Sequence, residues 1–106
     1  MSKQERIDEI VDTVLQGAHA QVVNGVTYFF AEGGWHSGAR ELDELVVGID
    51  RSTTRSDRAE VRDLVGLLAP KGAFAPPRYI AFRNGVLDVE TMAFSDASPD
   101  LIVPNR

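Results

Sequence analysis

The sequence predicts a single α+β domain with three helices plus a small antiparallel sheet. Three segments repeat their apolar residues with the 3.6-residue period of a helix, at residues 3–16, 37–49 and 55–68. Short runs rich in β-branched and aromatic residues follow the first and the third of these segments. The length of 106 residues fits one domain and leaves no room for two.

Composition narrows the class of protein further. The chain carries 11 basic and 16 acidic residues, for a net charge of −5, and the whole acidic excess lies in residues 1–68. This balance argues against coating of nucleic acid by bulk charge, although a local basic patch remains open. The absence of cysteine excludes disulfides and suits the cytosol. The longest apolar run, residues 64–69, is far too short for a membrane span, so no membrane partner is expected.

The first helix is expected over residues 3–16. Ser2 and Glu5 have the spacing of a capping box, and Gly17 is a typical helix terminator. The apolar positions form one stripe: Ile7, Ile10, Val11, Val14 and Leu15. The acidic residues of the opposite face are expected in water.

Residues 21–35 predict one or two strands joined to a short strand at Trp35. The dipeptides Asn24-Gly25 and Gly33-Gly34 mark the turns. The aromatic side chains of this run, Trp35 among them, are expected in the core. The alternative, a platform on which nucleic-acid bases stack, is disfavoured because no Lys or Arg lies between residues 21 and 37.

Two further helices are expected over Ser37–Ile49, with Ser37 as the cap, and over residues 55–68. Their inward stripes are Leu42, Leu45, Val46 and Ile49, then Val61, Leu64, Val65 and Leu68. The polar residues 50–54 separate the two helices.

The third helix segregates its charges. Arg55, Arg58 and Arg62 gather on one flank of the apolar stripe, and Glu60 and Asp63 gather on the other. Three interpretations stay open: an ordinary solvated helix with internal ion pairs, a flank that contacts phosphates, and an interface that closes a ring of subunits.

Residues 70–78 read as a loop because Pro76-Pro77 cannot continue a helix. A hairpin is expected next, with strands at 78–83 and 86–89 around an Asn84-Gly85 turn. A turn at residues 90–91 and a short strand at 92–94 follow, and residues 95–106 read as an extended tail. The resulting order of elements resembles that of a winged helix.

The chain offers no catalytic constellation. It lacks a phosphate-binding P-loop, and His19 and His36 have no metal-ligand spacing and are expected as exposed loop residues. Ser37 is better explained as a helix cap than as a nucleophile. Asp88 and Glu90 point to one side of a strand, so they could share a cation or simply form a polar strand edge. We therefore expect no catalytic residue, no metal and no cofactor.

Most of the chain resembles a known family. Residues 79–91 read Y-I-A-F-R-N-G-V-L-D-V-E-T and residues 98–100 read S-P-D. They are similar to the D5-N-like domain that precedes the superfamily 3 helicase in P4-type phage and plasmid DNA primases, with the approximate pattern I-x-F-x-N-G-V-L-D-L-x-T-G. Residues 28–35 resemble the aromatic region of the same domain. The chain departs from the pattern at Met92, where the family often has Gly, and at Val89, where Leu is usual.

The resemblance implies that residues 1–106 form one helicase-associated domain whose residues 95–106 are a tail. Its implied role is that of a non-catalytic module of a phage, prophage or plasmid primase-helicase, which assembles or positions the ATPase motor during DNA replication. The implied partners are the helicase domain of the same parent chain and further copies in an oligomer, within the bacterial host cytoplasm. The family's ATPase residues match no position here, so the chain looks like a module cut short at Arg106.

Two other readings remain. In one, the chain is a winged-helix-like DNA-binding domain, with the third helix as reader and the Asn84-Gly85 hairpin as the wing. In the other, it is a stand-alone phage regulatory protein or small enzyme. Five arginines are candidates for a contact with DNA or a subunit: Arg55, Arg58, Arg62, Arg78 and Arg83. Their convergence on one surface would favour a DNA contact, whereas acidic residues of the first two helices around them would disfavour it.

Overall fold

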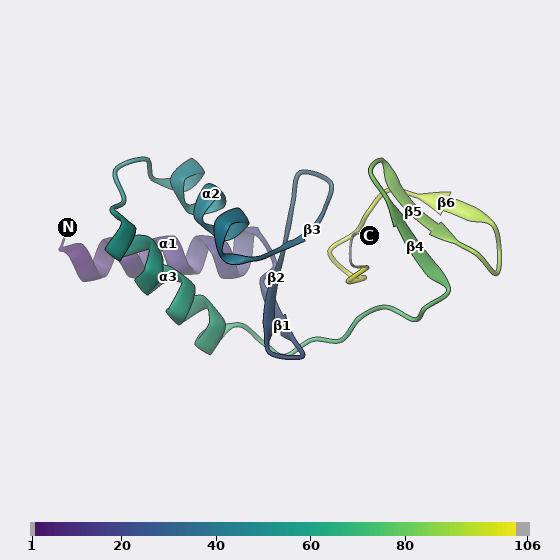
Figure 1. The fold of residues 1–106 in the computed structure, drawn as a ribbon, viewed down its shortest axis with the longest axis horizontal. Helices are drawn as coiled ribbons and strands as arrows, with labels where there is room; N and C mark the ends of the chain where they lie inside the picture. Colours follow the sequence, from purple (N-terminus) through teal and green to yellow (C-terminus); the bar gives the residue numbers. More distant parts are fainter. Residues whose placement is uncertain (1, 104–106) are drawn as a thin grey trace.

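Three helices and two small antiparallel sheets follow one another along an elongated molecule of 51 × 23 × 19 Å (Figure 1). The structure is a computed structural model and describes residues 2–103. The predicted α+β class is confirmed, with two separate three-stranded sheets where the sequence suggested one. In chain order the elements are α1 (Lys3–Gly17), β1 (Gln21–Val23), β2 (Val26–Ala31), β3 (Gly34–Ser37), α2 (Ala39–Ile49), α3 (Arg55–Leu68), β4 (Tyr79–Phe82), β5 (Gly85–Asp88) and β6 (Ala93–Ser95).

The main core lies where the three helices meet one another and β2. Its fully buried side chains include residues of every predicted helical stripe: Ile7, Val11, Val14, Val46, Val61 and Val65. Phe29 adds the contribution of β2. The acidic face of α1 is exposed as expected. Ile49 and Leu68 differ from the prediction, because they end their helices beyond the core and are exposed.

The helix ends show which local sequence signals correctly predicted a helix boundary. The Ser2 hydroxyl accepts a hydrogen bond from the backbone N–H of Glu5 (3.1 Å), as expected at the start of α1. α3 has the predicted bounds and a capping box between Thr54 and Asp57. The predicted Ser37 cap is wrong, because Ser37 ends β3 and α2 begins only at Ala39. Gly38 makes the link with a φ of 103°, a conformation that favours glycine.

The first sheet, β1-β2-β3, is an antiparallel meander. Asn24 and Gly25 both have positive φ (52° and 79°), which suits a two-residue hairpin turn. The second turn is formed by Glu32 and Gly33, one residue earlier than the predicted Gly33-Gly34 pair. Trp35 is buried, which confirms its place in a core.

The second sheet, β4-β5-β6, contains the predicted hairpin with its turn shifted by one residue. Phe82 pairs with Gly85, so Arg83 and Asn84 form the turn and Gly85 begins β5. Gly85 has a φ of 156°, and a Cβ atom there would collide with the backbone carbonyl oxygen of Ser95 and lie 2.8 Å from the Phe94 ring. Gly85 is therefore needed for the close approach of the β6 backbone as well as for its own backbone conformation.

Two segments connect the first sheet to the second, residues 69–78 and 96–103 (Figure 1). Lys71 forms a parallel bridge with Val22 at the edge of β1, and Phe74 forms one with Ile102. The Trp35 indole N–H donates to the carbonyl oxygens of Ser98 (3.2 Å) and Leu101 (2.7 Å). Residues 98–102 of the predicted extended tail thus contact Trp35 of the first sheet and the segment at Phe74, and residues 104–106 lie outside the described residues.

Candidate functional site

The five arginines predicted to contact DNA or a subunit do not share one surface. Arg55, Arg58 and Arg62 lie on α3 in the helical part of the molecule, whereas Arg78 and Arg83 flank β4 at the other end (Figure 1). α3 and the β4–β5 hairpin therefore also lie in different parts of the molecule, whereas a winged helix places its recognition helix and its wing side by side. The structure therefore does not assemble the reader and wing that the DNA-binding interpretation needs.

Three of these arginines already have partners within the chain. Arg62 forms an ion pair with Asp43 of α2, and Arg58 donates to the carbonyl oxygen of Thr53 (2.7 Å). Arg78 binds two carboxylates, described below. Arg55 and Arg83 are exposed and form no ion pair with another residue in the range 2–103. A phosphate contact would have to use these two or displace an acidic neighbour.

Asp88 and Glu90 do share a cation, and it is the guanidinium of Arg78. Its Nη2 lies 2.7 Å from Asp88, its Nη1 lies 3.0 Å from Glu90, and its carbon lies 5.2 Å from the centre of the Tyr79 ring. Burial acts to raise the pKa of Asp88, but bonds from Arg78 and from the backbone N–H groups of Glu90 and Thr91 outweigh it and lower the pKa. The two ion pairs therefore tie Arg78, just before β4, to Asp88 at the end of β5 and to Glu90 in the turn that follows.

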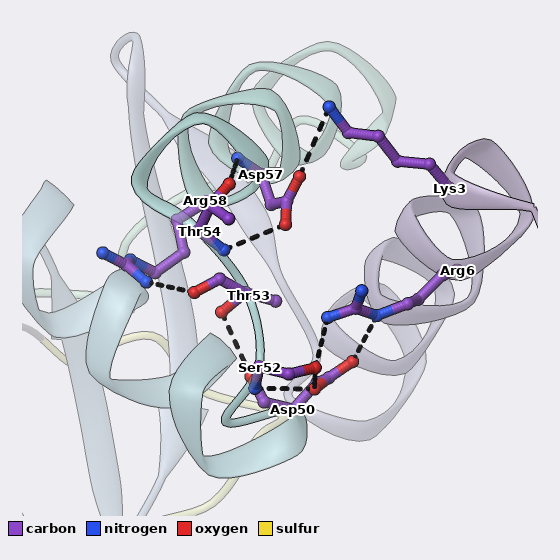
Figure 2. Close-up of polar contacts among 8 residues, drawn as sticks. All are labelled: Lys3, Arg6, Asp50, Ser52, Thr53, Thr54, Asp57 and Arg58. Atoms are coloured by element: carbon purple, nitrogen blue, oxygen red, sulfur yellow. Dashed lines mark hydrogen bonds and ion pairs between the residues drawn. The ribbon is translucent and has the colours of Figure 1, made fainter.

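A polar network joins α1 to the start of α3 (Figure 2). The Arg6 guanidinium donates to the carboxylate of Asp50 (2.6 Å) and to the hydroxyl of Ser52 (2.6 Å). Hydrogen bonds from Arg6 and then from Ser52 hold the pKa of Asp50 far below its ordinary value. Lys3 approaches Asp57 within 3.5 Å at the capping box. Each of these carboxylates accepts hydrogen bonds from neighbouring residues, so the network fastens α1 to the α2–α3 loop and to the first turn of α3.

The second sheet presents an apolar face that the sequence reading missed. Its register places four side chains on one side: Ile80, Phe82, Leu87 and Phe94. Phe82 is 49% exposed and Phe94 is 51% exposed, and their ring centres lie 6.3 Å apart. The available signal was the hairpin register, because once Phe82 pairs with Gly85 the alternation of both strands assigns these residues to the same face.

A cavity of about 430 Å³ lies between α2 and the strands β2 and β3. His36 borders it from β3, which corrects its expected position in an exposed loop. One ring nitrogen of His36 bonds the carbonyl oxygen of Ala31 (2.8 Å), the other lies 3.5 Å from the Glu41 carboxylate, and the ring stacks on Phe29. His19 is exposed, as predicted.

Within residues 2–103, no group of three or more His, Cys, Asp or Glu side chains is placed to hold a metal ion. No helix of the same range is long and apolar enough to cross a membrane. Comparison with known proteins finds no match among protein-family models and none among curated proteins.

Proposed function

We propose that this chain is a non-catalytic module of a phage, prophage or plasmid DNA primase-helicase, and that it helps to assemble or position the ATPase motor during DNA replication. The motor of the same parent chain and further copies in the oligomer are its partners, in the cytoplasm of the bacterial host. The exposed apolar face of β4–β6 carries the proposal, because a face of this kind is typical of a protein interface.

The position of this face links it to the resemblance. The segment that resembles the primase pattern, residues 79–91, supplies β4, β5 and the turn after them. Three of the four apolar residues of the face lie in that segment: Ile80, Phe82 and Leu87. The motif thus coincides with a surface suited to a neighbouring domain.

The turn after β5 gives independent support. Met92 occupies the position where the family pattern often has Gly, and it adopts a φ of 59°. Glycine reaches this left-handed conformation without steric cost, whereas methionine does not. The backbone therefore has the shape that the family's glycine favours, even though the residue differs.

The test is direct binding of the chain to a superfamily 3 helicase motor taken from the reading frame in which the chain is encoded. We expect binding that Phe82→Ser and Phe94→Ser each weaken by at least about tenfold, since each removes a large exposed ring from the face. Leu67→Ser is the matched control, because Leu67 is an exposed apolar residue of α3.

A second arm measures binding to single- and double-stranded DNA while the salt concentration is varied. We expect no binding at low salt, because the arginines are scattered and three of them are already engaged. Binding with a negative slope of log K against log salt would favour the DNA-binding interpretation instead. The absence of a Walker A motif from the reading frame, or motor binding unchanged by both Phe variants, would overturn the proposal.

A further inference from the structure

The cavity between α2, β2 and β3 has the size and chemistry of a small ligand site. Its volume of about 430 Å³ lies in the range of roughly 300–1,000 Å³ found for ligand pockets. Apolar side chains form much of its wall: Phe29, Ala31, Leu45 and Ile49. It is distinct from the face of β4–β6, so an inference from it does not depend on the proposed function.

The charged residues of the cavity are all acidic. Glu32, Glu41 and Glu44 line it, and none of its lining residues in the range 2–103 is Lys or Arg. Arg40 pairs with Glu44 at 3.4 Å, but its side chain is 93% exposed, so solvent screens that pair. One oxygen of Glu41 accepts from the backbone N–H of Ser37 (3.1 Å), and the other faces His36. The cavity therefore combines apolar surface with an excess of negative charge.

Gly48 is an exposed residue with open space beside it. It lies within α2 and lines the cavity, and a Cβ atom at this position would meet no atom within 4 Å. Its φ is not in the left-handed region, so neither the backbone nor the packing requires glycine. Glycine weakens a helix relative to almost any other residue. A larger side chain at this position would therefore have room to enter the cavity.

We infer that this cavity binds an organic cation, an ammonium or guanidinium group attached to an apolar stem or ring. The stem would contact Phe29, Leu45 and Ile49, and the cationic group would face Glu41 and its acidic neighbours. Such a group is carried both by free amines and by the lysine and arginine side chains of a protein, and the chemistry of recognition is the same.

The test is a titration of the isotope-labelled chain at low salt, followed by the amide signals in NMR spectra. The probes are phenethylammonium, the neutral isostere 2-phenylethanol, the anion 3-phenylpropionate, and the capped peptide acetyl-Ala-Arg-Ala-amide. We expect the phenethylammonium shifts to be confined to residues 29–36 and 41–49, with an affinity at least about tenfold above that of 2-phenylethanol. Tighter binding of the peptide than of phenethylammonium would identify a protein side chain as the source, and the reverse order would identify a free amine.

Two variants locate the site. Gly48→Leu fills the cavity at a helix position with open space and is expected to abolish binding, whereas Gly66→Leu, the matched change in α3, should leave it intact. Glu41→Gln should weaken binding about tenfold, and Glu60→Gln, which removes the same charge from α3, should not. Circular dichroism checks that each variant is folded. Equal affinity for 2-phenylethanol and phenethylammonium, or binding unchanged in Gly48→Leu, would overturn the inference.

Discussion

Among residues 2–103, four residues other than glycine adopt a positive φ, and each lies in a turn or link between elements. They are His19, Asn24, Glu32 and Met92. Asn24 suits this conformation, because a short polar side chain tolerates it well. Met92 does not, since a left-handed backbone brings its Cβ close to the following carbonyl oxygen, at a cost of about 1–2 kcal/mol. The strain at Met92 is a local property that no hydrophobic pattern reveals.

We therefore expect Met92→Gly to stabilise the protein by about 0.5–1 kcal/mol, because relief of the strain exceeds the extra chain entropy of glycine. Met92 is 69% exposed, so little packing is lost. Urea unfolding measures the change. The neighbouring Ala93→Gly is the control and should destabilise, since Ala93 lies in β6 without positive φ. A loss of stability in both variants would contradict this account.

At the scale of elements, the α1 helix is attached to the rest of the bundle in two ways. Its apolar stripe packs in the core, and Arg6 bonds Asp50 and Ser52 in the loop that precedes α3 (Figure 2). The stripe could be read from the 3.6-residue period. The polar attachment could not, because Arg6 and Asp50 are 44 residues apart and nothing local pairs them.

The Asp50 network predicts a defined response to acid. The pKa of Asp50 is lower in the folded protein than in the unfolded chain, so its contribution to stability is present above the ordinary aspartate pKa of about 4 and is lost as the pH falls below it. We expect Asp50→Asn to lower Tm at pH 7 and to flatten the fall of Tm between pH 5 and pH 2.

Thermal unfolding followed by circular dichroism at each pH measures this effect. Asp96→Asn is the control, because Asp96 is exposed and forms no ion pair with the described residues. It should leave the pH profile of Tm unchanged. If Asp50→Asn keeps the same slope as the wild type, the carboxylate is not coupled to folding in this way.

At the scale of the whole molecule, the returning segment at residues 96–103 joins the second sheet to the first. Ile102 is buried with Val23 and Trp35, and the Trp35 indole N–H bonds two carbonyl oxygens of the segment. This small second core lies apart from the main helical core. The elongated molecule therefore depends on contacts between residues more than sixty positions apart.

We expect Ile102→Ala to destabilise the protein by about 2–4 kcal/mol, because it leaves a cavity in this small core. The loosened segment should also expose Trp35 and shift its fluorescence emission to longer wavelength. Leu67→Ala is the control, since Leu67 is 80% exposed and should change stability by less than about 0.5 kcal/mol. An unshifted emission with unchanged stability would show that residues 96–103 are not held by this contact.

A structural feature could be predicted from the sequence when the residues that form it lie close together in the chain. The helix bounds of α1 and α3 were predictable because the apolar period, Ser2 and the polar break before Arg55 act within a few residues of one another. The Asn84-Gly85 signal predicted the hairpin but misplaced its turn, because the Phe82–Gly85 pairing and the Phe94 ring decide the register. The candidate arginines were found as a pattern, but the acidic partners of Arg62 and Arg78 lie elsewhere in the chain, 10 to 19 residues away.

The sequence alone determined the α+β class, the three helices and the positions of both groups of strands, because these depend on periodicity and local turn preferences. Only the tertiary structure decided that the strands form two sheets, that Asp43, Asp88 and Glu90 neutralise two of the predicted contact arginines, and that an apolar face and an acidic cavity remain open. Pairing between distant residues is governed by the register and packing of whole elements, and no short stretch of sequence contains that information.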